Sequence, residues 1–251
     1  MTSTGRTLNF LVTNPNFKNF KKMNRYDQDL QDLLGFVKMY GTVRDGEVSI
    51  FSKNVTHNMK SGFPKSTVFE NPDWDKLLNG VLDFIKANRE AFDALIERIK
   101  QEPYSHDMAL SNMVFYVRPL TADERTHFWL NSNEMGSLTL DEVRELDHYD
   151  AQWKGVPKGA LSIMWTNAYS SVLDLNPKMQ FNAFILSILA RETNMMPDWV
   201  MGNIGTLSVM QDDDVQELLE KESYWLPTFY INEEFNLDSE FDASMFEMVE
   251  A

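Results

Sequence analysis

The sequence predicts a single α/β (α+β) domain. Its 251 residues fit one large domain, although two small ones are possible. Two strand-like runs, at 112–119 and 160–166, lie between helical apolar stripes at 77–85 and 181–189. The content of 43% hydrophobic and 12% aromatic residues is enough for a sizeable core, and no apolar run is long enough to span a bilayer.

In the first half of the chain we expect an irregular lead-in over 1–25, an amphipathic helix over 26–40 and a short strand over 48–51. Pro72 opens a long helical pattern, at a position where a missing N–H costs nothing. The apolar stripe of this pattern is interrupted by polar residues at 86–90. The region before Pro103 is therefore either one broken helix or two consecutive helices.

The second half opens with a β-rich run at 112–119 that a proline closes. Residues 120–147 are polar and mixed, which predicts an insertion or lid with a capped helical turn. The patterns that follow predict a strand over 160–166, an amphipathic helix over 181–193 and a strand over 198–210 with a bend at Gly202 and Gly205. A further helix is expected to begin at 212–214. No internal repeat or interdomain linker is evident.

The formal charge of −15 is concentrated near the C-terminus. Residues 212–251 contain 13 acidic residues and one lysine, so they carry −12 and the other 211 residues carry −3. An acidic tail over about 231–251 would repel phosphate, which argues against direct nucleic-acid binding. The tail is either a solvated terminus or an arm that docks on a basic protein partner. Its aromatic residues, Phe235, Phe241 and Phe246, either form an interaction motif or pack back on the domain.

The chain contains no cysteine, which excludes disulfides, thiolate metal sites and cysteine nucleophiles. Its first residues lack the basic start and long apolar stretch of a secretory signal. Both observations fit a cytoplasmic protein. His57, His106 and His127 show no metal-ligand spacing, so we predict no metal site.

Two stretches carry a family resemblance. Residues 48–85, VSIFSKNVTHNMKSGFPKSTVFENPDWDKLLNGVLDFI, combine a Ser-Ile-Phe strand, an Asn-hydrophobic-X-X-Gly-Phe-Pro turn and a long helix. Residues 161–210 continue as strand, helix and strand. In order and spacing both resemble the thymidylate synthases and the related phage deoxycytidylate hydroxymethylases, over roughly 48–221. The resemblance implies a three-layer fold with a large mixed sheet flanked by helices, a homodimer through that sheet, and the host cytoplasm as location if the chain is phage-encoded.

The residues that carry the family's chemistry are mostly replaced. The family attacks C6 of a pyrimidine with a cysteine thiolate, and the spacing puts Asp147 in that place, followed by His148 and Gln152. A carboxylate is a much weaker carbon nucleophile, and adjacent residues on a strand face opposite ways, which also disfavours Asp147 and His148 as an acid–base pair. Gly80 or a neighbour stands where the resemblance implies the catalytic glutamate, with Asp83 as the nearest acid, and Thr56 stands where it implies a phosphate-binding arginine.

The resemblance also implies what lines the inherited pocket. Asn182 matches the asparagine that bonds the uracil ring, although it could simply cap a helix. Asn167 lies in the family's Gln-Arg-Ser-X-Asp pattern, and Asn203 and Ser208 lie in the strand that holds the ribose. Arg118 could meet a ligand anion or pair with a carboxylate. The alignment further implies a short loop insertion around 176–177.

These replacements predict a catalytically retired protein with a thymidylate-synthase-like fold. It would act without a cofactor as a binding, regulatory or structural component, in a homodimer or a heteromer. The first alternative, supported by Asn182, is a divergent pyrimidine deoxynucleotide methyl- or hydroxymethyltransferase with a non-cysteine mechanism. The second alternative is an acidic interaction protein that blocks a basic surface of a partner.

Overall fold

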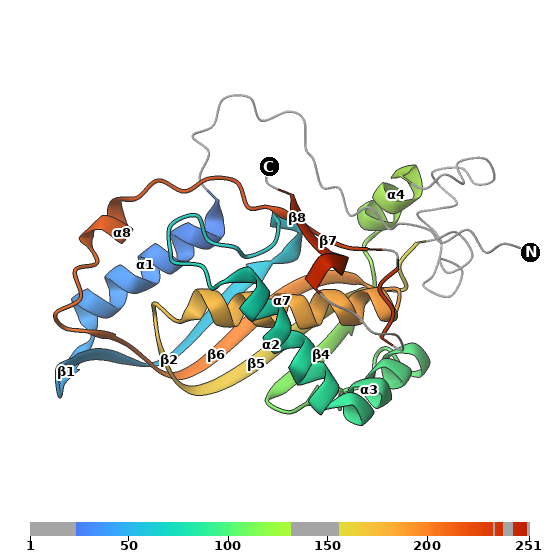
Figure 1. The fold of residues 1–251 in the computed structure, drawn as a ribbon, viewed down its shortest axis with the longest axis horizontal. Coiled ribbons are helices and arrows are strands. Elements are labelled where there is room, and N and C mark those ends of the chain that lie inside the picture. The colour runs from blue at the N-terminus through green and yellow to red at the C-terminus, as the bar shows by residue number, and fades with distance from the viewer. Residues whose placement is uncertain (1–23, 132–155, 233, 238–242, 250–251) are drawn as a thin grey trace, which may run out of the picture.

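A computed structural model describes residues 24–131, 156–232, 234–237 and 243–249. A six-stranded mixed sheet in the order β1-β2-β6-β5-β4-β3 forms its centre, and helices flank the sheet (Figure 1). This confirms the expected α/β architecture. The sheet strands are β1 (Thr42–Arg44), β2 (Glu47–Asn58), β3 (Ala109–Leu110), β4 (Met113–Arg118), β5 (Ala160–Ser171) and β6 (Met196–Met210). The helices are α1 (Arg25–Tyr40), α2 (Trp74–Ala87), α3 (Arg89–Gln101), α4 (Ala122–Asn131), α7 (Leu175–Glu192) and α8 (Gln216–Glu220), with 3₁₀ turns η1 (Met59–Ser61) and η3 (Ala243–Met245).

The sheet is antiparallel except where β5 pairs with β6. Parallel neighbours need a crossover connection, and α7 provides it between these two strands. In Figure 1, α1, α2 and α7 lie on the viewer's side of the sheet. Of these, α1 packs on β2 and β6, and α7 packs on β5 and β6. One face of the sheet is thus covered by helices.

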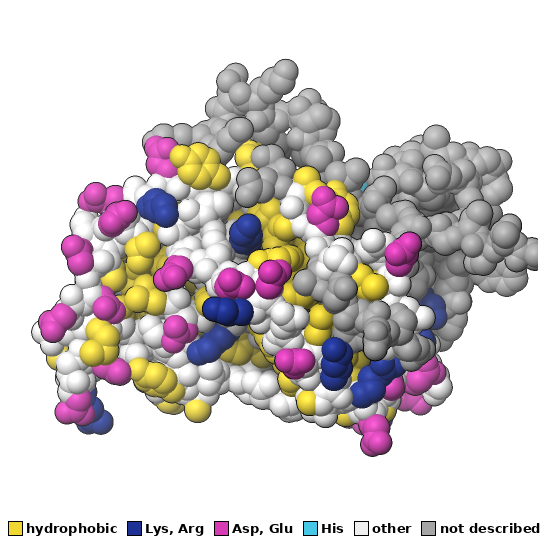
Figure 2. Space-filling model, in the orientation of Figure 1, with side chains coloured by type: hydrophobic (Ala, Val, Ile, Leu, Met, Phe, Trp, Pro, Cys, Tyr) yellow, Lys and Arg dark blue, Asp and Glu magenta, His cyan; other side chains and the backbone are white. Residues whose placement is uncertain are grey.

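The C-terminal region folds back on the domain. The strands β7 (Thr228–Ile231) and β8 (Phe246–Val249) form a separate antiparallel pair. Phe235 and Phe246 are buried, with ring centroids 5.1 Å apart, so these two aromatic residues pack back rather than project. Phe241 lies outside the described residues. Acidic side chains of the preceding segment remain on the surface around α8, on the left of Figure 2.

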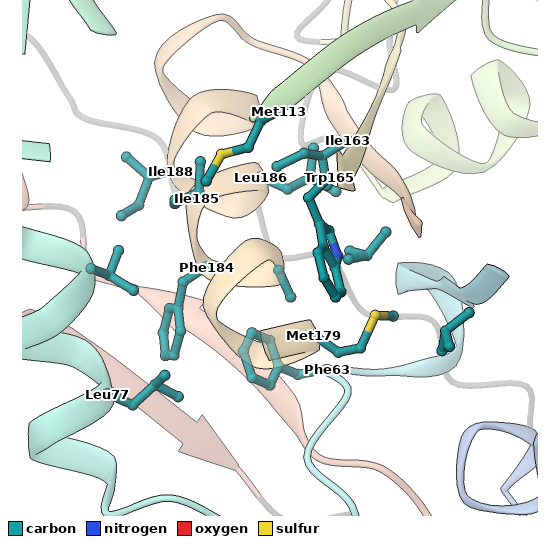
Figure 3. Close-up of a cluster of buried hydrophobic side chains, with 14 of the residues drawn as sticks. Phe63, Leu77, Met113, Ile163, Trp165, Met179, Phe184, Ile185, Leu186 and Ile188 are labelled. Carbon is teal, nitrogen blue, oxygen red and sulfur yellow. The ribbon is translucent and has the colours of Figure 1, made fainter. Parts of the chain in front are cut away.

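The helix α7 runs through the middle of the core. Of its 18 residues, 13 are buried, as expected for a helix with neighbours on all sides. Trp165 of the sheet lies on one side of the helix, and Phe184 points to the other (Figure 3). The ring centroid of Phe184 is 4.9 Å from that of Trp74 and 4.7 Å from that of Phe229. The helix begins six residues before the predicted start at 181. Residues 176–177 therefore lie in its first turn, so the expectation of a loop there is wrong. A proline is tolerated in the first turn because its N–H groups have no intrahelical partner.

Other helix boundaries follow the sequence closely. Asn24 caps α1, since its Oδ1 accepts from the N–H of Asp27 at 2.7 Å. The broken pattern after Pro72 resolves into two helices, α2 and α3, which separate at Asn88. The amide of Asn88 donates back to the carbonyl of Phe84 at 2.8 Å and closes α2. The strands β2 and β5 are each longer than predicted.

Those two strands and β6 share an irregularity at three neighbouring positions, which is called the fault below. In each strand, the alternation of buried and exposed side chains changes phase, at Ser52 in β2, Gly205 in β6 and Ala168 in β5. These three residues are neighbours across the sheet, and the pairing stays in register on both sides of them. Ser52 has a φ of 56°, and a Cβ on Gly205 would lie 2.7 Å from the carbonyl oxygen of Ala168. The aligned fault lets the inner face remain apolar along the whole length of the strands.

Candidate functional site

Among the described residues, nothing covers the central strands on the sheet face opposite α7, which is called the open face below. Val114, Met164, Met201 and Thr56 are directly paired across β4, β5, β6 and β2, so their side chains form one row on this face. Val114, Met164 and Thr56 are exposed, and Met201 is half-buried. Thr56, where the resemblance implies a phosphate-binding arginine, is therefore part of a largely apolar surface row.

Large side chains continue this open face. Tyr116 of β4 is 55% exposed and Trp199 of β6 is 39% exposed. Beyond the fault, Phe51 is 82% exposed and pairs through Thr206 with Tyr169. A small apolar cluster beside α4 borders the opposite end of the open face. It consists of Leu120, Val156, Ala160 and Met196, with Phe128 packed against them. The open face is thus an apolar and aromatic surface bounded by α4.

Hydroxyl groups occupy the end of the face beyond the fault. The hydroxyl of Tyr169 lies 2.9 Å from both carboxylate oxygens of Glu47 and 2.7 Å from Oγ of Ser208. Ser208 is buried, and the hydroxyl of Tyr169 is the hydrogen-bond partner of its own hydroxyl. Its position matches a ribose-binding residue by resemblance, but here it braces β6 against β5 and β2.

The proposed pocket residues do not converge. Asn203 is exposed on the open face, where it pairs with Thr166 and Asn54. Asn167 pairs with Ile204, whose buried side chain points to the covered face. Asn203 and Asn167 therefore lie on opposite sides of the sheet. Asp147, His148 and Gln152 lie outside the described residues.

Asn182 lies in the interior of α7, so the prediction that it caps a helix is wrong. It is buried, and its Nδ2 donates to the carbonyl of Lys178 one turn earlier, at 2.8 Å. Its Oδ1 has no hydrogen-bond partner among the described residues. A buried acceptor without a donor is costly, so this oxygen calls for a ligand or a water.

Arg118 is committed to carboxylates of its own chain. Its guanidinium meets Asp198 at 2.7 and 3.0 Å and Glu124 at 2.8 and 2.9 Å, while Lys60 also pairs with Glu124. Burial by itself would raise the pKa of Glu124, but hydrogen bonds from Arg118 and Lys60 outweigh it and hold that pKa well below its ordinary value. Of the two roles considered for Arg118, the structure therefore shows the carboxylate pairing.

A buried polar network, which the sequence did not reveal, ties the 62–73 loop to α1 and α7. The carboxylate of Asp27 is fully buried and accepts from Ser66 Oγ, Thr67 N, Thr67 Oγ1 and Asn24 Nδ2. On the α7 side, Asn176 accepts from the N–H of Ser66 and donates to the carbonyl of Glu70. A network whose members all have partners fixes the path of an otherwise irregular loop.

His57 lies beside this network. Its ring contacts that of Tyr26, with centroids 5.0 Å apart, and its Nε2 is 2.8 Å from the carbonyl oxygen of Gly62. Burial lowers its pKa to about 4, against smaller raising effects of Gly62 and Asp27. The imidazole is therefore neutral near pH 7 and its Nε2–H donates to Gly62, which makes it a structural donor.

Within the described residues, no group of three or more His, Cys, Asp or Glu side chains could hold a metal ion. A search of those same residues finds no helix with the length and apolarity that crossing a membrane requires. No protein-family model matches the chain, and a comparison with curated proteins finds no significant relative.

Proposed function

We propose that this chain is a non-catalytic protein with a thymidylate-synthase-like fold, which works as a binding or structural component in the form of a homodimer. The open sheet face would be the dimer interface. The observation that carries the proposal is the row of Val114, Met164, Met201 and Thr56, an apolar strip across four strands that no part of the described chain covers.

A sheet face of this kind suits a twofold contact. Monomeric proteins rarely leave contiguous apolar patches beyond a few hundred Å² exposed, and larger ones mark interaction sites. In a twofold dimer the same patch contacts itself, so one apolar row with aromatic flanks is sufficient. Tyr116, Trp199 and Phe51 are residue types enriched in such interfaces.

The state of the polar residues supports a non-catalytic role. The chain has no cysteine to attack a pyrimidine ring. The guanidinium of Arg118 and the hydroxyl of Ser208 are both engaged within the chain, so neither is available to a nucleotide without breaking existing bonds. Releasing Arg118 would leave Asp198 buried and unpaired, which opposes a change of partner.

The dimer is tested by placing a charge in the middle of the row. We expect Met164→Lys to convert a dimer into a 29.1 kDa monomer in sedimentation equilibrium, because the two copies would each bury a lysine. Val43→Lys is the matched control, since Val43 is also exposed but pairs with Val48, which faces the covered side. A wild-type chain that stays monomeric at high concentration, or a Met164→Lys variant that still dimerises, would refute the proposed interface.

Asn182 favours a second candidate, a divergent pyrimidine deoxynucleotide methyl- or hydroxymethyltransferase. Its partnerless Oδ1 is the acceptor that the resemblance assigns to a pyrimidine N–H. The assay is tritium release from C5-labelled deoxyuridylate, with and without methylenetetrahydrofolate. Release that Asn182→Leu abolishes would establish the enzyme and overturn the non-catalytic proposal, whereas absence of release would remove this candidate.

A further inference from the structure

A groove of about 850 Å³ lies between α1 and the segment around α8. One wall is a stripe of α1 that includes Gln28, Gln31, Gly35, Phe36, Met39 and Tyr40, and the other wall is residues 219–224. The stripe repeats at helical spacing from Gln28 to Tyr40, 12 steps along the helix, which gives a length of about 18 Å at 1.5 Å per residue. The groove is therefore long enough to hold a short stretch of polypeptide.

The apolar lining of the groove is unusually exposed. Met39 is 72% exposed and Tyr40 is 67% exposed at the C-terminal end of α1, and Tyr224 is 59% exposed on the other wall. Gly35 lies in the middle of the stripe, although glycine lowers helix stability relative to alanine. A Cβ at this position would meet only Leu219, at the ordinary contact distance of 3.8 Å. The described residues therefore give no steric reason for glycine here. Because glycine has no side chain, no group projects from this position into the groove.

The groove is also acidic. Asp32, Glu220 and Glu222 line it, and Figure 2 shows acidic side chains around apolar ones over α1 and α8. The lysines nearby are already engaged: Lys221 donates to the carbonyl of Val68, and Lys38 donates to three backbone carbonyls. The ammonium of Lys53 lies 4.1 Å from the ring centroid of Phe36. A ligand that complements this surface combines positive charge with large apolar side chains.

We infer that the groove is the docking site of the chain's own N-terminal segment, residues 1–23. That segment contains Arg6, Lys18, Lys21 and Lys22 and no acidic residue, so it carries +4 opposite the acidic walls. It also contains the aromatic residues Phe10, Phe17 and Phe20, interleaved with those lysines. Its composition is thus the complement of the groove in both charge and apolar character.

The point at which the segment joins the described chain supports this assignment. The N–H of Asn24 donates to Ser223 Oγ at 3.2 Å, and its side-chain amide donates to the carbonyl of Tyr224. Ser223 and Tyr224 are groove residues, so the described chain begins, at Asn24, beside the groove. At about 3.3 Å per extended residue, the six residues before Asn24 are sufficient to run the length of the stripe.

The absence of cysteine allows a single-site label to test the docking in the full-length chain. A nitroxide attached to Asn19→Cys should broaden the amide NMR signals of the groove residues Gly35 and Glu222. The signals of Val114 and Tyr116 on the open sheet face should keep their intensity. Loss of signal at the sheet face, or no loss at the groove, would overturn the inference.

Two variants and one mixture sharpen the test. The triple variant Lys18→Glu/Lys21→Glu/Lys22→Glu and the groove-filling variant Gly35→Leu should each restore the broadened signals, the first through charge and the second through shape. If neither restores them, charge and shape complementarity do not hold the segment. Mixing spin-labelled chains with unlabelled ¹⁵N chains should give no broadening, because docking within one chain is invisible to its neighbours. Broadening in the mixture would assign the groove to a second copy and refute the inference.

Discussion

Asp27 provides the sharpest test of what fixes the 62–73 loop. Its carboxylate is fully buried and has no cationic partner among the described residues, and it accepts four hydrogen bonds, from Ser66, Thr67 (two) and Asn24. Replacing Asp27 with alanine removes all four acceptor contacts at once. The variant therefore asks whether these bonds, rather than the apolar contacts of the loop, hold it against α1.

The size of the effect follows from which donors can find another acceptor. The hydroxyls of Ser66 and Thr67 can rotate, whereas the N–H of Thr67, at 3.0 Å, and the amide of Asn24, at 2.7 Å, are fixed by backbone and cap geometry. A buried donor left without an acceptor costs about 1–3 kcal/mol. Because Asp27→Ala leaves two fixed donors in this state, we expect it to lower the free energy of unfolding by about 3 kcal/mol.

Urea denaturation of Asp27→Ala, followed by far-UV circular dichroism, measures this loss. The control is Asp29→Ala on the same helix, where the side chain is 44% exposed and its ion pair with Arg25 is 3.7 Å long. An exposed pair of this kind contributes about 0–1 kcal/mol. Equal losses in the two variants would refute the reasoning, because the buried network would then contribute no more than a surface ion pair.

Three further predictions concern packing and charge. A Cβ on Gly202 would lie 2.5 Å from a buried tryptophan ring, so Gly202→Ala should destabilise by about 1–3 kcal/mol, whereas Gly80→Ala, with open space around it, should stabilise α2 by about 0.5–1 kcal/mol in the same urea assay. Arg118→Met leaves the buried Asp198 unpaired and should cost about 3 kcal/mol; an unchanged denaturation midpoint would show that the pair is not needed. The folded-state pKa of His57 is about 4, below its unfolded value of 6.5, so the unfolded chain binds the extra proton between these values. The free energy of unfolding should therefore decrease by about 3 kcal/mol as the pH falls from 6.5 to 4, and the His57→Leu variant should lack this decrease. Identical pH profiles of stability for the wild type and the variant would contradict the prediction.

Apolar periodicity located the helices well, and its failures have a physical cause. The stripes of α1, α2 and α3 face one core, so their period is visible in the sequence. The start of α7 was missed because Asn176, Pro177 and Gln180 resemble a loop. Those amides are satisfied by residues about 105 positions away, such as Asn71, and no local pattern reveals such partners.

The strands show a second limit. The predicted runs in β2 and β5 ended at Phe51 and Thr166, just before the in–out alternation changes phase at Ser52 and Ala168, so the continuation of each strand was missed. For the site, the sequence placed Asn203 and Ser208 on one strand but gave no sign of the sheet face on which each lies. The partner of Arg118 is Asp198, 80 residues away, and only the fold brings that pair together.

The aligned fault in β2, β5 and β6 constrains how this protein can change. Ser52, Gly205 and Ala168 each shift the side-chain alternation of their strand, and they do so side by side. Deleting one of them alone would turn every later residue of that strand inside out relative to its neighbours. An insertion or deletion in one of these three strands alone is therefore disfavoured. Length variation is better tolerated in the loops that connect the strands.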